Sequence, residues 1–330
     1  MIEVVQAGFH TSVQDPGRHG LRSSGIGQSG AMDGWALRLV NALIGNAADA
    51  AAIEITLGRS AFRFQADTVF AIGGADGAAM LDGTALPNWW VRTASAGQVL
   101  RFGAPRSGVR TYLTVQGGID VPAMMGSRAT DTKGAFGGFE GRLLAKGDVL
   151  CARGAAPARQ SPGFGLSVRR LDPYPELADG VPVIGILPAT AWADFTDEAH
   201  ARLTGETWQV SPQSNRIGSR LEGPELVPRR VRELHSHGIL PGVVQVPPSG
   251  QPIVQLCDGN TCGGYPVIAT IIQPHLHLFA QLAPGARLRL RQTDMAGALA
   301  AQASQQARLA EIESIAGAAR VRAGLPGAAA

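Results

Sequence analysis

The stretch Val109-Arg-Thr-Tyr-Leu-Thr-Val115 is a short β-rich run that is followed, after Gln116, by the turn residues Gly117-Gly118. Similar apolar runs between turns, such as Thr68–Ile72 and Val149–Leu150, recur through residues 1–150. The chain contains 43 glycines and 21 prolines, and so many helix breakers favour short strands joined by turns over long helices. We therefore predict a mostly β fold. The second half continues the pattern with runs at Val183–Leu187, Gln251–Leu256 and Val267–Ile272.

Helical periodicity is clearest at Ala31–Ile44, where four apolar residues recur on one face: Met32, Ala36, Leu39 and Leu43. Ser29 is a candidate N-cap, and Gly45 has the position of a terminating glycine. A second, short helix is predicted at Ala191–Leu203.

The tail from Thr293 to Arg322 is rich in Ala, Gln and Arg and predicts an amphipathic helix. Its expected apolar contacts are Leu299, Leu309, Ile312 and Ile315.

The chain has 330 residues, which suits two lobes better than one small core. The segment from Gly154 to Gly165 is small, polar and contains proline, so we interpret it as a linker. The predicted organisation is an N-terminal β lobe (1–153), a linker (154–165), a second β lobe (166–291), and a C-terminal helix and tail (292–330).

Composition excludes several classes of partner. The net charge is only +3 and the basic residues form no run, so no nucleic-acid surface is expected. The longest apolar stretch, Val181–Ala193, is short and interrupted by Pro182 and Pro188, so no membrane span is expected. We see no signal peptide, and three cysteines at irregular spacing argue against a disulfide framework. The expected location is cytoplasmic, with all three thiols free.

Covalent attachment of biotin is not expected on this chain. Biotin needs an exposed lysine, usually flanked by methionines, and neither Lys133 in Thr-Lys-Gly nor Lys146 in Ala-Lys-Gly fits. The sequence also lacks a P-loop and a G-x-S-x-G motif. Cys257 and Cys262 have a poor zinc spacing, and Cys262 is more readily interpreted as a small buried thiol than as a nucleophile.

Two His-x-His pairs, His235/His237 and His275/His277, would each point to one face of a strand, as metal ligands can. No third ligand is indicated nearby. The prediction is therefore no metal site.

The strongest signals are sequence blocks that follow one another in a fixed order. They include Thr11-Ser-Val-Gln-Asp-Pro-Gly-Arg-His-Gly20, Gly117-Gly-Ile-Asp-Val-Pro122, Gly126-Ser-Arg-Ala-Thr-Asp131, Gln245-Val-Pro-Pro-Ser-Gly-Gln-Pro-Ile253 and Asp258-Gly-Asn-Thr-Cys-Gly-Gly-Tyr-Pro266. The series resembles the allophanate hydrolase subunit 2 family, also called biotin-dependent carboxyltransferase. That family includes the C-type subunit of bacterial ATP-dependent 5-oxoprolinase and half of the carboxyltransferase part of urea carboxylase.

The resemblance implies a two-lobed, mostly β, cyclophilin-like β-barrel architecture with few short helices. It implies a partner, the subunit 1 or B-type chain, and an active site shared with it. An A-type subunit that opens lactams is a further expected partner. ATP with Mg²⁺ is expected at the level of the complex, where it would activate the lactam oxygen of 5-oxoproline before the ring opens.

Urea, 5-oxoproline and the ureido ring of biotin are all planar N–C=O groups, so a site for them needs a donor for the oxygen and an acceptor for the N–H. Candidate catalytic residues are Asp15, Arg128 and Asp258, with Arg128 and Asp258 expected to line one ligand site from different lobes. Structural roles stay open: a turn for Asp15, a local Arg128–Asp131 pair, and a barrel-corner tyrosine at position 265. The candidate substrate-binding residues are Arg18, Thr130, Asp131, Thr261 and Tyr265.

Three positions depart from the family pattern. Asn215 removes a carboxylate, Ser219 removes an aromatic ring, and Cys262 stands where threonine is common. These changes leave another amide substrate open. The alternatives to a 5-oxoprolinase subunit are the carboxyltransferase half of a urea-carboxylase-like system and a regulatory protein that antagonises a kinase inhibitor.

Overall fold

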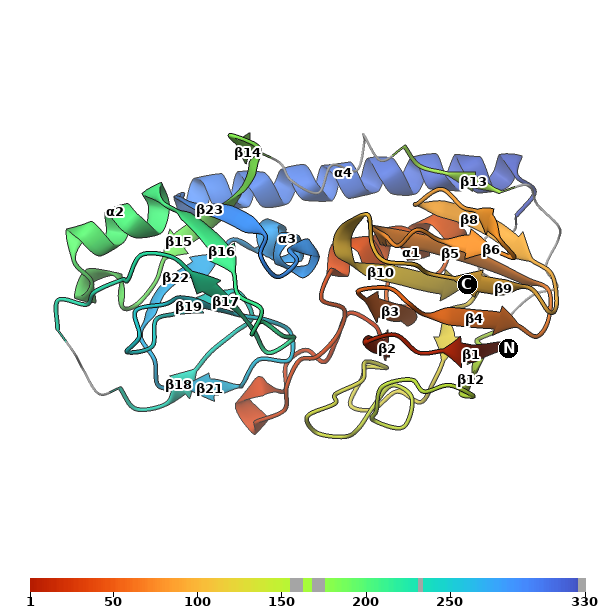
Figure 1. The fold of residues 1–330 in the computed structure, drawn as a ribbon, viewed down its shortest axis with the longest axis horizontal. Coiled ribbons are helices and arrows are strands. Elements are labelled where there is room, and N and C mark those ends of the chain that lie inside the picture. Colours follow the sequence, from red (N-terminus) through yellow and green to blue (C-terminus); the bar gives the residue numbers. More distant parts are fainter. Residues whose placement is uncertain (155–162, 168–175, 231–233, 326–330) are drawn as a thin grey trace. The chain divides into compact units, whose positions relative to one another are not determined.

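The computed structural model describes residues 1–154, 163–167, 176–230 and 234–325 (Figure 1). The chain divides into two compact units. Of the residues that the structure describes, 34% lie in strands and 21% in helices, which confirms the mostly β prediction. The first unit comprises Met1–Arg18, Ser29–Leu171 and Ala307–Ala330, and the second comprises His19–Gln28 and Asp172–Gln306.

The first unit contains two antiparallel β-sheets. The seven-stranded sheet has the order β11-β12-β1-β4-β9-β6-β7, with bounds Ile119–Asp120, Val149–Ala152, Ile2–Gln6, Ala61–Phe64, Val99–Arg101, Met80–Leu81 and Thr84–Ala85. The six-stranded sheet has the order β13-β8-β5-β10-β3-β2, with bounds Phe164–Gly165, Trp90–Ala94, Thr68–Asp76, Ser107–Val115, Ala52–Thr56 and His10–Gln14.

Each sheet contributes one apolar face to a shared core. Val4 and Phe62 come from the seven-stranded sheet, and Ile55 and Leu113 come from the six-stranded sheet. All four side chains are buried in one cluster, so the unit is a β-sandwich. Most of the predicted linker (154–165) lies outside the described residues; of its described residues, Phe164 and Gly165 pair with β8.

Helix α1 (Gly34–Ile44) covers part of the outer face of the six-stranded sheet. It starts later than predicted. Asp33, not Ser29, is the N-cap, and its side chain accepts a hydrogen bond from the backbone N–H of Ala36 at 2.8 Å. Gly45 ends the helix in the left-handed conformation, as predicted.

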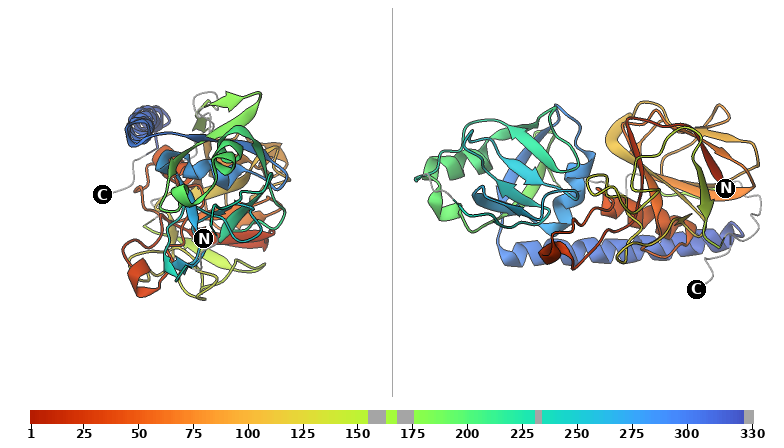
Figure 2. Two further views of the ribbon diagram at one scale, coloured as in Figure 1. Left: turned by 90° about the vertical axis from the view of Figure 1, so that its left-hand side faces the viewer. Right: turned by 90° about the horizontal axis from the view of Figure 1, so that it is seen from below.

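Helix α4 (Met295–Arg322) is one uninterrupted helix, which confirms the C-terminal helix (Figure 2). Its residues Leu309, Ile312 and Ala316 join α1 in a second buried cluster of the first unit. The predicted contacts of Leu299 and Ile315 are wrong, because these side chains are 56% and 37% exposed.

The second unit is a closed seven-stranded barrel, in the order β15-β22-β19-β20-β17-β16-β23. The strands β15 and β23 pair in parallel and close it, and β14 (Leu177–Ala178) extends from β15. A closed sheet leaves no unpaired edge. The bounds are Val181–Pro188, Val267–Ile271, Val243–Gln245, Ile253–Gln255, Gly218–Glu222, Thr207–Val210 and Arg287–Gln292.

Short helices flank the barrel strands. The predicted helix Ala191–Leu203 is in fact two elements, the 3-10 helix η3 (Trp192–Asp194) and α2 (Asp197–Gly205). The break occurs because Thr196 is extended and caps α2, accepting from the backbone N–H of Ala199 at 3.1 Å. The remaining elements of the described residues are η1 (Arg22–Ser24), η4 (Gln273–His275), α3 (Leu276–Gln281) and the two-stranded sheet of β18 (His237–Gly238) and β21 (Cys262–Gly263).

In the described part of the chain, none of the helices combines the length and hydropathy needed to cross a membrane.

Candidate functional site

Asp15 follows directly after strand β2 and ties three segments of the first unit together. Its Oδ1 accepts from the backbone N–H of Gly17 at 2.8 Å and from the hydroxyl of Ser127 at 2.6 Å. Its Oδ2 accepts from the backbone N–H of Arg128, and its carbonyl accepts from Ala31 N–H at 2.9 Å. Both carboxylate oxygens are therefore used within the protein, and Asp15 acts here as a positioning group.

Arg18 is fully buried and holds the loop that carries the other candidates. Its guanidinium donates to the carbonyls of Ala129 (2.5 Å) and Met124 (3.2 Å). It also lies over the ring of Phe136, 4.6 Å from the centroid, which is cation–π geometry.

Thr130 and Asp131 are also bound to backbone. The Thr130 hydroxyl donates to the carbonyl of Val13 at 2.8 Å. The Asp131 carboxylate accepts from the backbone N–H groups of Lys133 (3.1 Å) and Gly134 (2.8 Å), as in an Asx-turn. These bonds fix the shape of the 126–134 loop.

Arg128 and Asp131 do not form the local pair that was the alternative. None of the ion pairs between described residues joins them. The Arg128 Nε is buried and makes no hydrogen bond within the described residues. Asp15, Arg18 and Thr130 are held by hydrogen bonds through their side chains, whereas the buried Nε of Arg128 can still donate to a ligand.

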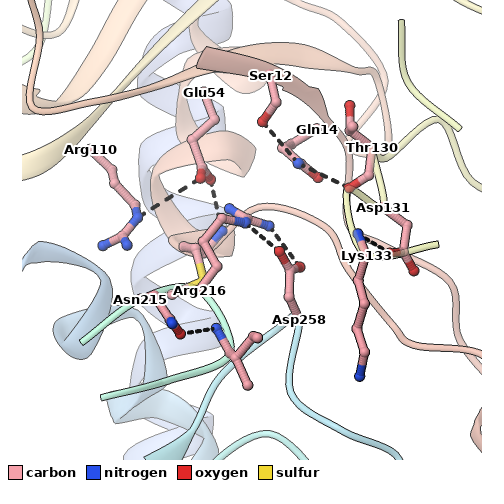
Figure 3. A network of polar contacts seen from close by, with 12 residues as sticks. Ser12, Gln14, Glu54, Arg110, Thr130, Asp131, Lys133, Asn215, Arg216 and Asp258 are labelled. Carbon is pink, nitrogen blue, oxygen red and sulfur yellow. Dashed lines mark hydrogen bonds and ion pairs between the residues drawn. The ribbon is translucent and has the colours of Figure 1, made fainter. Parts of the chain in front are cut away.

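A buried network beside α1 was not predicted. Glu54 is fully buried and accepts from the Tyr112 hydroxyl (2.7 Å) and the Met32 N–H (2.8 Å), and Tyr112 accepts from the Asp33 N–H (2.8 Å). The Arg110 Nε lies 3.8 Å from the Glu54 carboxylate (Figure 3). Burial, and then the carboxylate of Glu54, raises the pKa of Tyr112 well above its ordinary value, so this phenol remains a donor.

In the second unit, Asp258 forms a buried bidentate ion pair with Arg216, drawn in Figure 3. The two oxygens accept from the Arg216 Nε at 2.7 Å and from a terminal guanidinium nitrogen at 3.0 Å. Asn215 accepts from the N–H groups of Ile217 (2.9 Å) and Gly218 (3.2 Å) through its side-chain oxygen. An aspartate could accept the same two bonds, so the Asn215 departure preserves this turn.

Arg22 holds the loop that follows Asp258. Its guanidinium donates to the carbonyls of Ile239 (2.8 Å) and Asn260 (2.6 Å). Burial lowers the pKa of Arg22, an effect that nearby Cys257 opposes. No local sequence pattern singles out this residue, because its partners are backbone carbonyls more than 200 positions away.

Thr261 and Tyr265 complete the second group. The Thr261 carbonyl accepts from the Ile239 N–H at 3.1 Å. Tyr265 is exposed, so it does not pack as a barrel-corner tyrosine. Cys262 is exposed in β21, so the prediction of a buried thiol was wrong.

Neither His-x-His pair lies on a single strand. His237 belongs to β18, but His235 precedes that strand. His275 ends η4 and His277 lies in α3. The His275 Nδ1 accepts from the Gly185 N–H at 2.8 Å. The part of the chain that the structure describes contains no cluster of three or more His, Cys, Asp or Glu side chains suited to a metal ion.

The candidates thus form one group in each unit, around Asp15 and around Asp258. That Arg128 and Asp258 line one shared site remains a prediction.

The chain combines a β-sandwich unit with a closed barrel, and each unit has a buried polar group beside a glycine-rich loop. These features define a two-unit β protein of the carboxyltransferase type. The chain belongs to the family described as "Carboxyltransferase domain, subdomain A and B", which matches residues 24–292.

Two relatives align with almost the whole chain. The chain is 44% identical to the C-type subunit of 5-oxoprolinase from Escherichia coli over 306 residues, 93% of this chain and 96% of that protein. It is 36% identical to the protein of the same name from Haemophilus influenzae over 315 residues, 96% and 98% of the two chains. The crystal structure of Kluyveromyces lactis urea carboxylase aligns with a TM-score of 0.85 and 29% identity, covering 94% of this chain and 29% of that one.

Proposed function

We propose that this chain is the C-type subunit of a 5-oxoprolinase, part of a complex that opens 5-oxoproline to glutamate with hydrolysis of ATP. The observation that carries the proposal is the 44% identity to the Escherichia coli protein, because the match extends over 96% of that protein. The family resemblance in the sequence blocks supports the same conclusion.

The substrate chemistry fits the group around Asp15. 5-Oxoproline offers a lactam N–H, a lactam carbonyl and a carboxylate. The guanidinium of Arg128 suits a carboxylate through a bidentate pair of charge-assisted bonds. The backbone of Arg128 is fixed by Asp15, which holds the donor in place before substrate binds.

We assign ATP and its Mg²⁺ to the complex rather than to this chain alone. When bound, ATP supplies the phosphoryl group that activates the lactam oxygen. The predicted carboxylates of this chain are engaged elsewhere: Asp15 with Gly17, Ser127 and Arg128, and Asp258 with Arg216. In this proposal a B-type partner and an A-type partner complete the nucleotide and water sites.

The experiment is reconstitution. This chain, a B-type and an A-type subunit are purified separately and together, and glutamate and ADP formation from 5-oxoproline are measured. The expected result is turnover only when all subunits are present, with none from this chain alone. A fully assembled complex without 5-oxoproline-dependent ADP release contradicts the proposal.

A second candidate is the carboxyltransferase half of a urea-carboxylase-like system. It is supported by the TM-score of 0.85 to the Kluyveromyces lactis enzyme, of which this chain matches 29%. Since no biotin is expected on this chain, a separate biotin carrier would be required. Transfer of carboxylate from biotin to urea by the assembled complex would favour this candidate over lactam opening.

A further inference from the structure

Three buried side-chain atoms beside Asp15 make no hydrogen bond within the described part of the protein. They are Oε1 of Gln14, Oγ of Ser29 and Nε of Arg128. Gln14 and Ser29 are 0% and 1% exposed. Most buried polar atoms in native proteins are hydrogen-bonded, so three unbonded ones in neighbouring segments point to a ligand that would bond them.

The three atoms belong to the segments that Asp15 ties together. Gln14 precedes Asp15 in the chain, and the Arg128 N–H donates to the Asp15 carboxylate. Ser29 lies two residues before Ala31, whose N–H donates to the Asp15 carbonyl. Close backbone contact supports this arrangement, because a Cβ on Gly30 would lie 2.8 Å from Gly17.

The orientation of the Gln14 amide follows from its partners. Its Nε2 donates to the Ser12 hydroxyl at 3.0 Å and to the Thr130 carbonyl at 3.3 Å. A carbonyl can only accept, so the nitrogen must face Thr130 and the oxygen must face away from it. Gln14 therefore presents a fixed acceptor.

We propose that Gln14, Ser29 and Arg128 form the subsite that recognises a small cyclic amide carrying an acidic group. The Gln14 Oε1 accepts the amide N–H, the Ser29 hydroxyl donates to the amide carbonyl, and the Arg128 guanidinium binds the carboxylate. This inference rests on the proposed function and adds two residues, Gln14 and Ser29, that determine specificity for the amide.

Another unbonded atom, in the same sheet as Gln14, provides the matched control. Thr56 Oγ1 is also buried without a hydrogen bond among the described residues. Thr56 pairs with His10 at one end of the β2–β3 ladder, whereas Gln14 pairs with Ala52 at the other end. Thr56→Val removes a buried hydroxyl from the same sheet without touching the proposed subsite.

The test compares 5-oxoproline with its lactone analogue, in which a ring oxygen replaces the N–H. The reconstituted complex is assayed for KM with the lactam and for the inhibition constant of the lactone. A site that bonds the N–H should bind the lactone at least about tenfold more weakly, because Oε1 would then face a lone pair.

Gln14→Met should raise the KM for the lactam at least about tenfold and leave lactone inhibition nearly unchanged, so that the preference disappears. Ser29→Ala should weaken lactam and lactone alike, because both have the carbonyl. Thr56→Val should alter neither. A purely structural role for Gln14 would lower the Tm and affect both ligands equally.

Two results would overturn the inference without affecting the proposed function. One is a wild-type complex that turns over 5-oxoproline but binds the lactone as tightly as it binds 5-oxoproline. This result can be obtained without any variant. The other is a lactam preference that survives in Gln14→Met. Absence of any turnover in the assembled wild-type complex would instead refute the proposed function itself.

Discussion

The buried Arg216–Asp258 ion pair provides the sharpest test of the barrel unit. The two side chains are only 7% and 9% exposed, and both carboxylate oxygens accept from the guanidinium. Removing one member of such a pair leaves an uncompensated buried charge and costs about 3–5 kcal/mol. Asp258→Ala should therefore lower the Tm by roughly 6–20 °C, at about 2–4 °C per kcal/mol for a domain of this size.

The matched control is Asp197→Ala in the same unit. Asp197 pairs with Arg229 at 2.6 Å, but these side chains are 91% and 47% exposed. Exposed pairs contribute about 0–1 kcal/mol, so this variant should melt close to wild type.

The assay is calorimetric melting of both variants, of Arg216→Met, and of the Arg216→Met/Asp258→Ala double variant. The double variant should be more stable than the sum of the two single costs would predict, because it leaves no buried charge unpaired. The reasoning is refuted if Asp258→Ala costs no more than Asp197→Ala, or if the two single effects simply add.

Three further predictions concern individual side chains. Burial, and to a lesser degree the neighbouring His277, lowers the pKa of His275 from 6.5 to about 4. The unfolded chain therefore binds a proton at this position before the folded chain does, and stability should fall as the pH drops from about 6.5 to about 4. The Tm of His275→Gln should fall less than that of the wild type over the same pH range. Arg320 donates to the backbone carbonyls at the C-terminal end of α1, so Arg320→Gln should cost about 1.5–3 kcal/mol in urea unfolding, and an unchanged midpoint would contradict this. Thiol titration of the native protein should find Cys151 and Cys262 reacting quickly and Cys257 slowly, in line with their exposure, and a stable disulfide would contradict the cytoplasmic prediction.

The fold class was predictable because strand and helix periodicity are local properties. The predicted strand Val109–Val115 lies within β10, and the α1 helix ends at Gly45 as predicted. The N-cap was misplaced because two polar residues precede the helix. Ser29 has a positive φ of 52°, whereas Asp33 lies where its carboxylate reaches a free N–H. The choice between them depends on three-dimensional structure.

The site was harder to predict because the residues that hydrogen-bond to the candidate side chains are distant in sequence. Asp15 and Asp258 were identified as polar residues beside glycines, but their partners lie 112 and 42 residues away. The buried Glu54 did leave a signal, an acid within the otherwise apolar Ala51–Ile55 segment. A charge at such a position predicts a buried polar network, although it does not say which residues complete it.

The division of the chain between its two units has a consequence for biosynthesis. The sandwich requires Leu309, Ile312 and Ala316 of α4 for one of its buried clusters. The barrel takes up residues 19–28 from the opposite end of the chain. A ribosome therefore releases every barrel strand before it releases the helical turns that finish the sandwich. If the gene were divided between the two halves, each encoded fragment would lack a segment that the other fragment contains. We therefore expect folded, soluble fragments only when the two are expressed together.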